Sequence, residues 1–373
     1  MAQAHGQIGA VEKWVLGVES SCDETAAAVV SSDGELGSDV VHSQVTLHAP
    51  YGGVVPELAA RDHLRAVGPV VREALRRSGR ALRPGGGDGG IDAIAVTNRP
   101  GLIGALLVGV QIAKGLSLAT GVPLVGVDHL VGHLLAPFVR RAQRVEGADA
   151  PLSFPYVALL ASGGHTALYR VDGPLPKDVR ELGATRDDAA GEAFDKVAKL
   201  LGLGYPGGPL VDRVAKTGDA SRVKLAAPMA HRKGLEFSFS GLKTQVASWV
   251  AAHGALEPSD VADVCASFQA TATRVLVDKL VGAAQQEGVG RIVLTGGVAA
   301  NSELRARAMV AARAAGLTLH VPPIASCTDN AAMIAYAGAQ RVVAGELDDG
   351  RLAASSSSVL PRRTRRGPGA HFA

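Results

Sequence analysis

A strand–turn–strand pattern that occurs twice constrains this chain more than any single motif. Its first copy spans residues 14–30 and its second spans residues 156–171. In each copy two short apolar runs flank a turn of small and polar residues, 20–24 in the first and 162–165 in the second. Apolar runs of this length, bounded by Ser, Gly and Asp, predict strands joined by short turns. The recurrence predicts an internally duplicated fold.

Each half also contains an apolar run that leads into a glycine-containing turn and then into a helical pattern. Residues 91–97 precede the turn at 100–101, and residues 291–295 precede the turn at 296–297. Strands that alternate with helices of 10–15 residues predict an α/β fold, with helices packed on the faces of a sheet. Two similar halves leave a cleft between them, and we expect a ligand to bind there.

The same pattern divides the chain into two predicted subdomains. The N-terminal one spans residues 14–139, the C-terminal one spans 153–345, and a polar connector joins them. Residues 1–13 are predicted to be flexible. In residues 346–373, four serines precede an arginine-rich ending that has little to bury, so this tail is predicted to be disordered.

Composition excludes several classes of protein. The 38 Lys and Arg against 35 Asp and Glu leave a net charge of +3, too little for a protein coated in nucleic acid, although a local basic face remains open. Cys22, Cys265 and Cys327 form no paired spacing, which argues against a disulfide framework and for a reducing compartment. The most apolar stretch, 101–113, is shorter than the ~20 residues that cross a bilayer. We therefore expect a cytoplasmic protein without a membrane segment.

Three turns after predicted strands could cradle a phosphate. They lie at residues 20–25, 162–166 and 296–297, and small residues there leave backbone N–H groups open to an anion. A single turn of this kind is more often only a hairpin. Three at corresponding places in a duplicated chain predict a nucleotide site, although none matches a P-loop or a GxGxxG turn.

His129 and His133 are the clearest candidate metal ligands. They follow Asp128, a plausible helix N-cap, and their spacing of four places both on one helical face. The alternative is one capped and one core histidine. The pair is not the HExxH motif of zinc proteases, because Leu130 stands where that motif has glutamate. Asp329, at the start of a later apolar helix, is a candidate third ligand.

An acidic segment has two possible roles. Its members are Asp187, Asp188, Glu192 and Asp195, and acids at the start of a helix could simply complement the helix dipole. Alternatively, Asp195 and Asp212 could bind ribose beside the turn at 207–209.

A row of arginines follows Pro56 at helical spacing. Its members, which fall on one face of the expected helix, are Arg61, Arg65, Arg72, Arg76 and Arg80. This row is either a solvated face or a track for the phosphates of a nucleic acid.

Nine segments together resemble one known family, the bacterial TsaD family of tRNA adenosine threonylcarbamoyltransferases, formerly labelled glycoprotein endopeptidases. They are GVESSCDETAAAVV (17–30), YGGVVPELAARDH (51–63), PGLIGALLVG (100–109), HLVGHLLAP (129–137), LASGGHT (160–166), DDAAGEAFDKVAKLLGLGYPGGP (187–209), FSFSGLKT (237–244), TGGVAANSELR (295–305) and CTDNAAMIAYAG (327–338). The resemblance covers roughly residues 14–345. It implies two duplicated α/β domains of the actin, Hsp70 and sugar-kinase superfamily around a nucleotide cleft.

The resemblance also implies an activity and a set of site residues. Such proteins transfer a threonylcarbamoyl group from threonylcarbamoyl-adenylate to the exocyclic amine of the adenosine beside the anticodon, in tRNAs that read codons beginning with A. One divalent metal per subunit, usually iron with zinc as an alternative, is implied at His129, His133 and Asp329. The residues implied in binding the adenylate are Leu160, Ala161, Ser162, Gly163, Gly164, Asp195, Gly208, Asp212 and Asn301. Asp23 and Glu24 are candidates for proton transfer, but no catalytic base is assigned.

The implied partners are tRNA, a TsaB-like paralogue that forms a heterodimer, and a TsaE-like ATPase. We expect the paralogue on the N-terminal subdomain and tRNA near Arg65 to Arg80. Two other functions stay open at this point: a metalloprotease that uses His129 and His133, and a nucleotide-regulated scaffold without transfer chemistry. Leu160 stands where some archaeal and eukaryotic relatives have a metal-binding tyrosine, so three protein ligands are expected.

Overall fold

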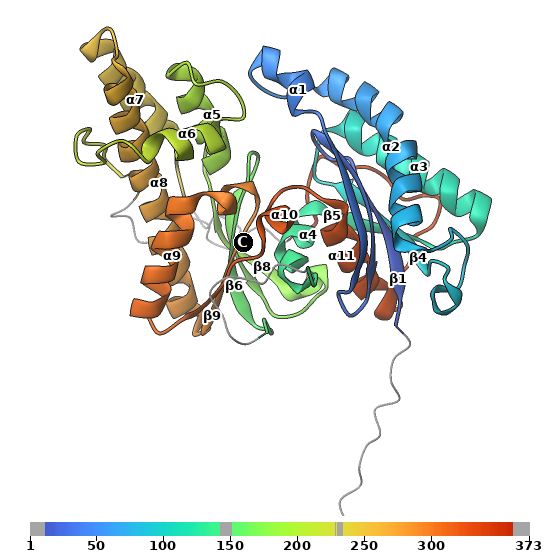
Figure 1. Cartoon of the computed structure of the whole chain (residues 1–373). Coiled ribbons are helices and arrows are strands. Elements are labelled where there is room, and N and C mark those ends of the chain that lie inside the picture. The colour runs from blue at the N-terminus through green and yellow to red at the C-terminus, as the bar shows by residue number, and fades with distance from the viewer. Residues whose placement is uncertain (1–11, 142–150, 228, 230–233, 361–373) are drawn as a thin grey trace, which may run out of the picture.

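The computed structural model describes residues 12–141, 151–227, 229 and 234–360. Its elements stack in five layers, helices, sheet, helices, sheet, helices, which Figure 1 shows nearly edge-on. We call the first sheet with its outer helices the N-terminal lobe, and the second sheet with its outer helices the C-terminal lobe.

The first sheet has the strand order β3-β2-β1-β4-β5. Its strands, in this order, are Leu36–Ser43, Glu24–Ser31, Trp14–Glu19, Ala93–Arg99 and Leu124–Asp128. The first three strands pair antiparallel, while β1, β4 and β5 run parallel. Parallel strands need crossover connections, which the helices between them supply.

The second sheet repeats this topology, in the order β10-β9-β6-β7-β8. These strands are Thr318–His320, Arg291–Thr295, Tyr156–Ala161, Thr166–Val171 and Val179–Ala184. Here β6, β7 and β8 pair antiparallel, and β6, β9 and β10 run parallel. Each strand therefore has a counterpart in the first sheet, which confirms the predicted duplication.

Helices cover both outer faces and fill the space between the sheets. The N-terminal outer layer holds α2 (Pro56–Ser78) and α3 (Ile103–Thr120), and the middle layer holds α4 (His129–Leu135) and α11 (Ala331–Val343). The C-terminal outer layer holds α5 (Ala190–Leu200), α6 (Gly207–Ala215), α7 (Ser240–His253), α8 (Pro258–Glu287) and α9 (Ser302–Ala314). The short elements are α1 (Val45–His48), α10 (Ile324–Cys327), η1 (Ala49–Tyr51), η2 (Gly86–Asp88), η3 (Ala136–Phe138), η4 (Pro176–Asp178) and η5 (Gly297–Ala300).

Alternation along the strands explains this layering. In β1, Val15 packs in the middle layer, whereas its neighbour Leu16 packs under the outer helices. In β6, Leu159 faces the C-terminal outer helices and Leu160 faces the middle layer. Because successive side chains point to opposite faces of a strand, an unbroken apolar run buries both faces of a sheet.

Small residues let the middle helix α11 approach the first sheet closely. A Cβ atom added to Gly17 of β1 would lie 2.3 Å from the carbonyl oxygen of Ala331. One added to Gly338 of α11 would lie 2.3 Å from the Cβ of Ala95 in β4. Glycine at both positions is therefore a packing requirement, which fixes the start of α11 beside the first strand.

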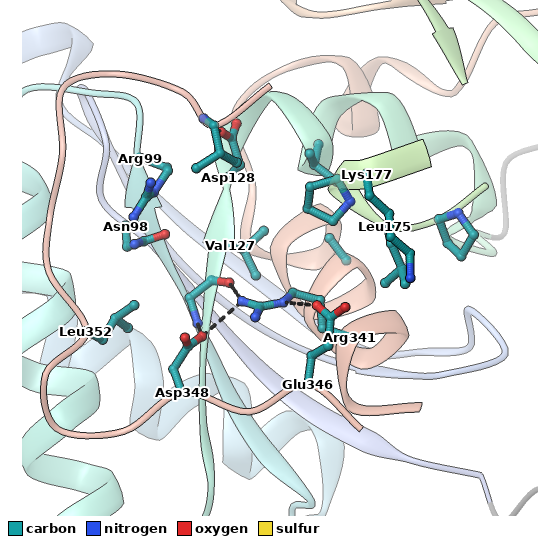
Figure 2. A pocket seen from close by; sticks show the side chains of 16 residues that line it. Asn98, Arg99, Val127, Asp128, Leu175, Lys177, Arg341, Glu346, Asp348 and Leu352 are labelled. Carbon is teal, nitrogen blue, oxygen red and sulfur yellow. Dashed lines mark hydrogen bonds and ion pairs between the residues drawn. The ribbon is translucent and has the colours of Figure 1, made fainter. Parts of the chain in front are cut away.

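Residues 346–360 differ from the predicted disordered tail, because they pack on the N-terminal lobe. The backbone N–H of Gly126 donates to Asp348, the Nδ2 of Asn98 donates to the carbonyl of Ala353, and Leu360 is buried. We call residues 346–360 the C-terminal strap. Figure 2 shows it running from Asp348 to the neighbourhood of Asp128, around a cavity of about 340 Å³. The rest of the predicted tail, 361–373, and of the flexible N-terminus, 1–11, lies outside the described residues.

Within the described residues, α3 is the one helix that is long and apolar enough to cross a membrane, with a mean hydropathy of 1.5. It packs against β4 and α2 in the N-terminal lobe. Its remaining face carries Ile103, Leu107 and Leu118, which are exposed. A core helix of an α/β domain passes the same test of length and composition, so this helix is weak support for a membrane span.

Candidate metal and substrate site

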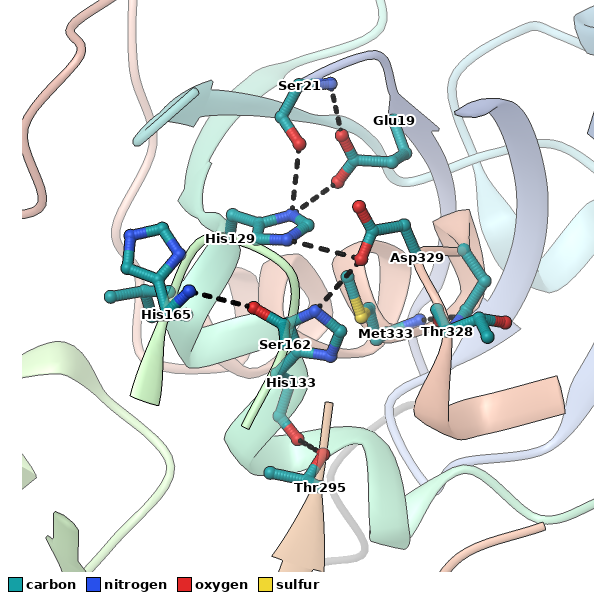
Figure 3. Close-up of polar contacts among 12 residues, drawn as sticks. Glu19, Ser21, His129, His133, Ser162, His165, Thr295, Thr328, Asp329 and Met333 are labelled. Atoms are coloured by element: carbon teal, nitrogen blue, oxygen red, sulfur yellow. Dashed lines mark hydrogen bonds and ion pairs between the residues drawn. The ribbon is translucent and has the colours of Figure 1, made fainter. Parts of the chain in front are cut away.

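Helix α4 presents two histidines in the middle layer, between the two lobes (Figure 3). Asp128 ends β5 and caps the helix, because its Oδ1 accepts a hydrogen bond of 2.9 Å from the backbone N–H of Leu130. His129 and His133 then lie one turn apart, with ring centroids 4.6 Å apart and the rings nearly perpendicular. The Oγ of Thr295 donates to the carbonyl of His133 over 2.7 Å, so the end of β9 holds this turn of the helix.

Asp329 reaches both histidines from the loop between α10 and α11. Its Oδ1 lies 3.1 Å from Nε2 of His133 and 3.5 Å from Nε2 of His129. One potential ligand atom from each of the three residues lies within 4.8 Å of the others. The structure therefore brings together all three residues predicted as ligands, from segments almost 200 residues apart in the chain.

Glu19, at the end of β1, supports this cluster from the other side. Its carboxylate is fully buried and lies 2.9 Å from Nδ1 of His129. The Oγ1 of Thr97 donates to the same carboxylate over 2.7 Å, and the backbone N–H of Ser21 donates over 2.5 Å. A carboxylate bound to the far nitrogen of a histidine fixes the tautomer and the direction of the ring. Sequence analysis did not single out Glu19.

Burial and the neighbouring charges shift the pKa values of the three candidate ligands in different directions. Burial opposes the charged form of His129, but the carboxylates of Asp329 and Glu19 raise its pKa well above the ordinary value. Burial would raise the pKa of Asp329, but the two histidines hold it well below the ordinary value. Burial lowers the pKa of His133, and its Nδ1 has no hydrogen-bond partner in the described part of the chain. Neutral imidazole and ionised carboxylate are the forms that bind a metal.

This donor set fits a divalent transition metal. Two imidazole nitrogens and one carboxylate on the same side of a site are the ligands of many non-haem iron(II) proteins, and zinc accepts the same atoms. Both Nε2 atoms point at one carboxylate oxygen, the arrangement expected when a cation belongs among the three groups. Three protein ligands leave coordination positions open for a substrate.

A family model described as TsaD, tRNA N6-adenosine threonylcarbamoyltransferase, matches residues 35–336. The chain belongs to this family. A protein of that name from Sorangium cellulosum is 64% identical over 360 residues, which cover 95% of this chain and 99% of that protein. Another, from Anaeromyxobacter dehalogenans, is 54% identical over 333 residues, which cover 89% and 95%. Membership makes the chain a transferase that acts in tRNA modification, and it does not favour the protease alternative.

Solved structures of a more distant protein share the fold. Full-length HypF in its phosphate- and nucleotide-bound form matches with a TM-score of 0.56 and 12% identity, over 89% of this chain and 46% of that one. HypF from T. kodakarensis matches with a TM-score of 0.57 and 15% identity, over 90% and 48%. This chain spans about half the length of HypF. The likeness supports the predicted actin-like class of fold.

The turn after β6 contains Ser162, Gly163 and Gly164, which the TsaD resemblance implied in binding the adenylate. Two hydrogen bonds close the turn. The N–H of Ser162 donates to the carbonyl of His165, and the N–H of His165 donates to Oγ of Ser162 over 3.2 Å. A Cβ added to Gly163 or Gly164 would touch nothing within 4 Å. Packing within the chain does not require these glycines, and their small size leaves the turn open to a ligand.

Leu160 and Ala161 cannot present their side chains to a ligand, because both are buried. Leu160 is fully buried in the middle layer, and Ala161 lies in the core of the C-terminal lobe. Only their backbone could contribute to binding. The apolar run before the turn at 162–165 predicted a strand here, and a role for Leu160 and Ala161 in binding came only from the resemblance.

Asp195 and Gly208 lie together where α5 meets α6. The carboxylate of Asp195 accepts a hydrogen bond of 2.7 Å from the N–H of Gly207, and burial raises its pKa. A Cβ on Gly207 would lie 2.6 Å from the Cα of Asp195, whereas Gly208 faces open space. This corner brings together a carboxylate and a glycine that borders open space, a combination suited to a polyhydroxyl ligand.

The remaining acids and Asn301 hold elements together. Asn301 caps α9 through Leu304 and also donates to Gln269, and Asp212 accepts from Ser302 over 2.7 Å. Two further acids in the predicted acidic segment are structural. Asp187 accepts hydrogen bonds from residues 238–240 at the start of α7, and Asp188 pairs with Lys196.

The loop between β1 and β2 gathers groups whose charged forms are disfavoured. Burial raises the pKa of Asp23, and it raises the pKa of Glu24 to about 8. One carboxylate oxygen of Glu24 accepts from Ser43 over 2.8 Å, and the other is buried without a partner in the described chain. Tyr205 belongs to the C-terminal lobe, and its pKa is raised by burial and by the negative charges of Asp23 and Asp195. The two lobes therefore face each other here through acidic groups.

Three of the five arginines in the row along and just after α2 make contacts within the chain. Arg76 pairs with Glu73, and Arg61 pairs with Glu57. The guanidinium of Arg80 lies 3.7 Å above the ring of Trp14 and donates to the carbonyls of Gly86 and Gly90. Arg80 is thus a packing residue that fixes the glycine-rich loop, and the row is not a continuous set of free cations.

The cavity of Figure 2 is separate from the metal-ligand cluster. It borders Asp128, but His129, His133 and Asp329 do not line it. Arg341, one of three cationic residues that line it, is already paired with Glu346 and Asp348.

Proposed function

We propose that the chain transfers a threonylcarbamoyl group from threonylcarbamoyl-adenylate to the N6 amine of the adenosine next to the anticodon, in tRNAs that read codons beginning with A. Family membership supports threonylcarbamoylation of tRNA. The observation that carries the proposal is the His129, His133 and Asp329 cluster, held between two duplicated α/β lobes.

A metal bound here, which we propose to be iron(II) with zinc as the alternative, would supply a Lewis acid for the carbamoyl carbonyl. His129, His133 and Asp329 would hold it. Glu19 keeps Nε2 of His129 directed at the site by binding Nδ1. Asp128 caps α4, so that both rings keep their spacing. The chain thus contributes a rigid set of ligands on a capped helix.

The adenylate half of the donor would lie along the open turns of the C-terminal lobe. Gly163 and Gly164 are exposed and border open space, so the backbone of this turn is suited to the phosphate that leaves as adenosine monophosphate. Asp195, beside Gly208, is suited to accept hydrogen bonds from ribose hydroxyls. In this arrangement the carbonyl carbon lies between the phosphate-binding turn and the ligand cluster.

The attack of the acceptor amine depends mainly on how the adenine is positioned. The N6 amine of adenine is a poor nucleophile, so much of the rate must come from holding it against the carbamoyl carbon. The amine loses a proton as the new C–N bond forms and the bond to the phosphate oxygen breaks. Asp23 and Glu24 lie on the loop nearest Asp329, but the geometry does not single out one of them as the base.

A TsaB-like paralogue would dock on the N-terminal lobe, and a TsaE-like ATPase would act with the pair. The outer layer of this lobe supports the first assignment. Leu64 on α2 and Ile103, Leu107 and Leu118 on α3 are exposed by 44% to 90%. Gly104 packs against Ala60, so the two helices form one surface. An apolar face of two adjacent helices fits a partner that presents the same kind of face.

The test is reconstitution with tRNA, the adenylate donor and the partner proteins, followed by mass spectrometry of the tRNA nucleosides. His133→Ala and Asp329→Ala should each abolish the modified nucleoside and lower the metal content of the purified protein. His253→Ala, a surface histidine on α7, is the matched control and should keep both. Modification by metal-free ligand variants at the wild-type rate would overturn the role of the cluster.

A further inference from the structure

A basic hollow of about 300 Å³ lies on the outer side of the C-terminal lobe, away from the ligand cluster. It is lined by residues 220, 221 and 223–225, by the middle of α8 and by one residue of α9. In Figure 1 these helices form the face of the C-terminal lobe that is turned away from the N-terminal lobe. Nothing in the proposed transfer reaction uses this hollow.

The charge of the hollow is of one sign. Three of its lining residues are cationic, Lys224, Arg274 and Arg307, and none is a carboxylate. Two residues with hydroxyl groups also line it, but both hydroxyls already donate a hydrogen bond within the chain. Thr271 donates to the carbonyl of Ser267, and Ser221 donates to Asp219. Recognition here therefore rests on the cations.

Two of the three cations are not neutralised by the fold. Lys224 and Arg274 form no hydrogen bond or ion pair with the described part of the chain, and both are exposed. Arg307 pairs with Glu303 through Nη2. The Nε of Arg307 is buried and has no acceptor in the described chain. A buried N–H without an acceptor is unfavourable, so Arg307 keeps a hydrogen-bond donor that the described chain leaves unused.

A phosphate group meets these requirements. Its oxygens accept from the fork of an arginine, and its charge balances the lysine and the second arginine. Backbone phosphates of a nucleic acid add affinity without reading sequence, because each contact releases counterions. In the arginine row, Arg61, Arg76 and Arg80 already have partners, and the two that remain, Arg65 and Arg72, are seven residues apart along the helix. Lys224 and Arg274 instead line one hollow, where a single phosphate can contact both.

We propose that this hollow, formed by Lys224, Arg274 and Arg307, binds a backbone phosphate of the tRNA substrate outside the reacting nucleotide. The proposal rests on the proposed function, because it assumes that tRNA is the substrate. It extends that function by placing part of the tRNA surface on the C-terminal lobe, whereas the sequence pattern had indicated α2.

The experiment compares two double variants of equal charge change in the full chain with its partner proteins. One is Lys224→Ala with Arg274→Ala, and the control is Arg65→Ala with Arg72→Ala on α2. Affinity for unmodified tRNA is measured by fluorescence anisotropy at several salt concentrations. The first variant should bind tRNA more weakly at low salt, and its slope of log affinity against log salt should fall by about 0.9, the change expected for the loss of one phosphate contact. The control should keep the wild-type slope.

A conservative variant separates recognition from folding. Arg307→Lys keeps the charge but removes the fork, so it should weaken tRNA binding with an unchanged unfolding midpoint. Inorganic phosphate, followed by 31P NMR, should bind the wild type weakly and compete with tRNA. If it binds at this hollow without competing, the site holds a free anion and the tRNA assignment is wrong.

Two further outcomes would overturn the inference. One is unchanged tRNA affinity in the Lys224→Ala, Arg274→Ala variant, and the other is an equal loss in both double variants, which would indicate only net charge. Failure of the proposed function can be told apart from failure of this inference. If the proposed function is wrong, the wild type forms no modified nucleoside, whatever the tRNA affinity of the variants.

Discussion

At the residue scale, the site depends on carboxylates that reach the two histidines from elsewhere in the chain. The spacing of His129 and His133, together with the polar start of the helix after Asp329, was enough to predict the three candidate ligands. Glu19 was not predictable in the same way. It ends an apolar strand, where a glutamate is indistinguishable from the first residue of a solvated turn. Its contact with His129 joins residues 110 positions apart.

Glu19→Gln should weaken metal binding while leaving the ligand atoms in place. The amide cannot stabilise the histidine ring as the carboxylate does, and losing such a support typically lowers metal affinity 10–100-fold. Competition with a chromogenic chelator measures the change. Glu57→Gln, on the exposed start of α2, is the control and should bind as the wild type does. Equal affinities for the two variants would contradict the role given to Glu19.

Glu24 should make the protein less stable as the pH rises from about 4.5 to 8. Burial raises its folded-state pKa to about 8, so the folded state binds more protons than the unfolded state in this range. The free energy of unfolding then falls with pH, by at most about 1.4 kcal/mol per unit from this group. Urea unfolding of Glu24→Gln across this range checks the sign. The variant should lose this dependence and be more stable than the wild type at pH 8, and a parallel pH profile would refute the assignment.

At the element scale, the strands and their turns were predictable because each is a local pattern, an apolar run that ends at small residues. The middle layer was not. Helices α4 and α11 face both sheets, and nothing local in HLVGHLL or AAMIAYAGAQ identifies which sheets they will contact. The C-terminal strap was missed for a related reason. Hydrogen bonds to Asn98, Gly126 and Asp128 hold it as well as apolar burial, so its serine-rich composition indicated disorder.

Ser358→Ala should destabilise the protein through Asp128. The Oγ of Ser358 donates to Oδ2 of Asp128 over 2.6 Å, and Oδ1 of the same carboxylate caps α4. Removing a donor to a buried carboxylate typically lowers stability by about 1.5–3 kcal/mol. Ser356→Ala is the matched control, since Ser356 is exposed and makes no side-chain hydrogen bond in the described chain. Urea midpoints that do not differ between the two variants would show that the strap does not support the cap.

At the scale of the whole molecule, the duplication and the two-lobed α/β architecture followed from the sequence, but the division into lobes did not. The predicted C-terminal subdomain includes α11, which instead packs on β1, β2 and β4 of the N-terminal lobe. A boundary drawn from composition follows the order of the chain, whereas the packing follows the faces that each helix buries. The core between the sheets contains strands and helices of both halves.

Two truncations separate the strap from the tail beyond it. A chain that ends at residue 360 keeps every described contact and should unfold at the wild-type urea concentration. A chain that ends at residue 345 loses the buried Leu360 and exposes the edge of β5, which pairs with the strap at Asp348. Burial of one leucine contributes about 1.5–3 kcal/mol, so the shorter chain should unfold earlier. Gel filtration should also show it associating, since an open strand edge pairs with other chains. Identical behaviour of both truncations would exclude a structural role for the strap.

The return of α11 and the strap to the first sheet also sets the order in which a nascent chain can fold. The strands of the N-terminal lobe leave the ribosome first, but the helix that covers one of their faces is made only after the whole second lobe has been translated. Asp329 directly precedes that helix, so the carboxylate that contacts His129 and His133 is synthesised only when translation is nearly complete. A ribosome that stalls in the second lobe would therefore release a first sheet with one bare face and with His129 and His133 lacking Asp329.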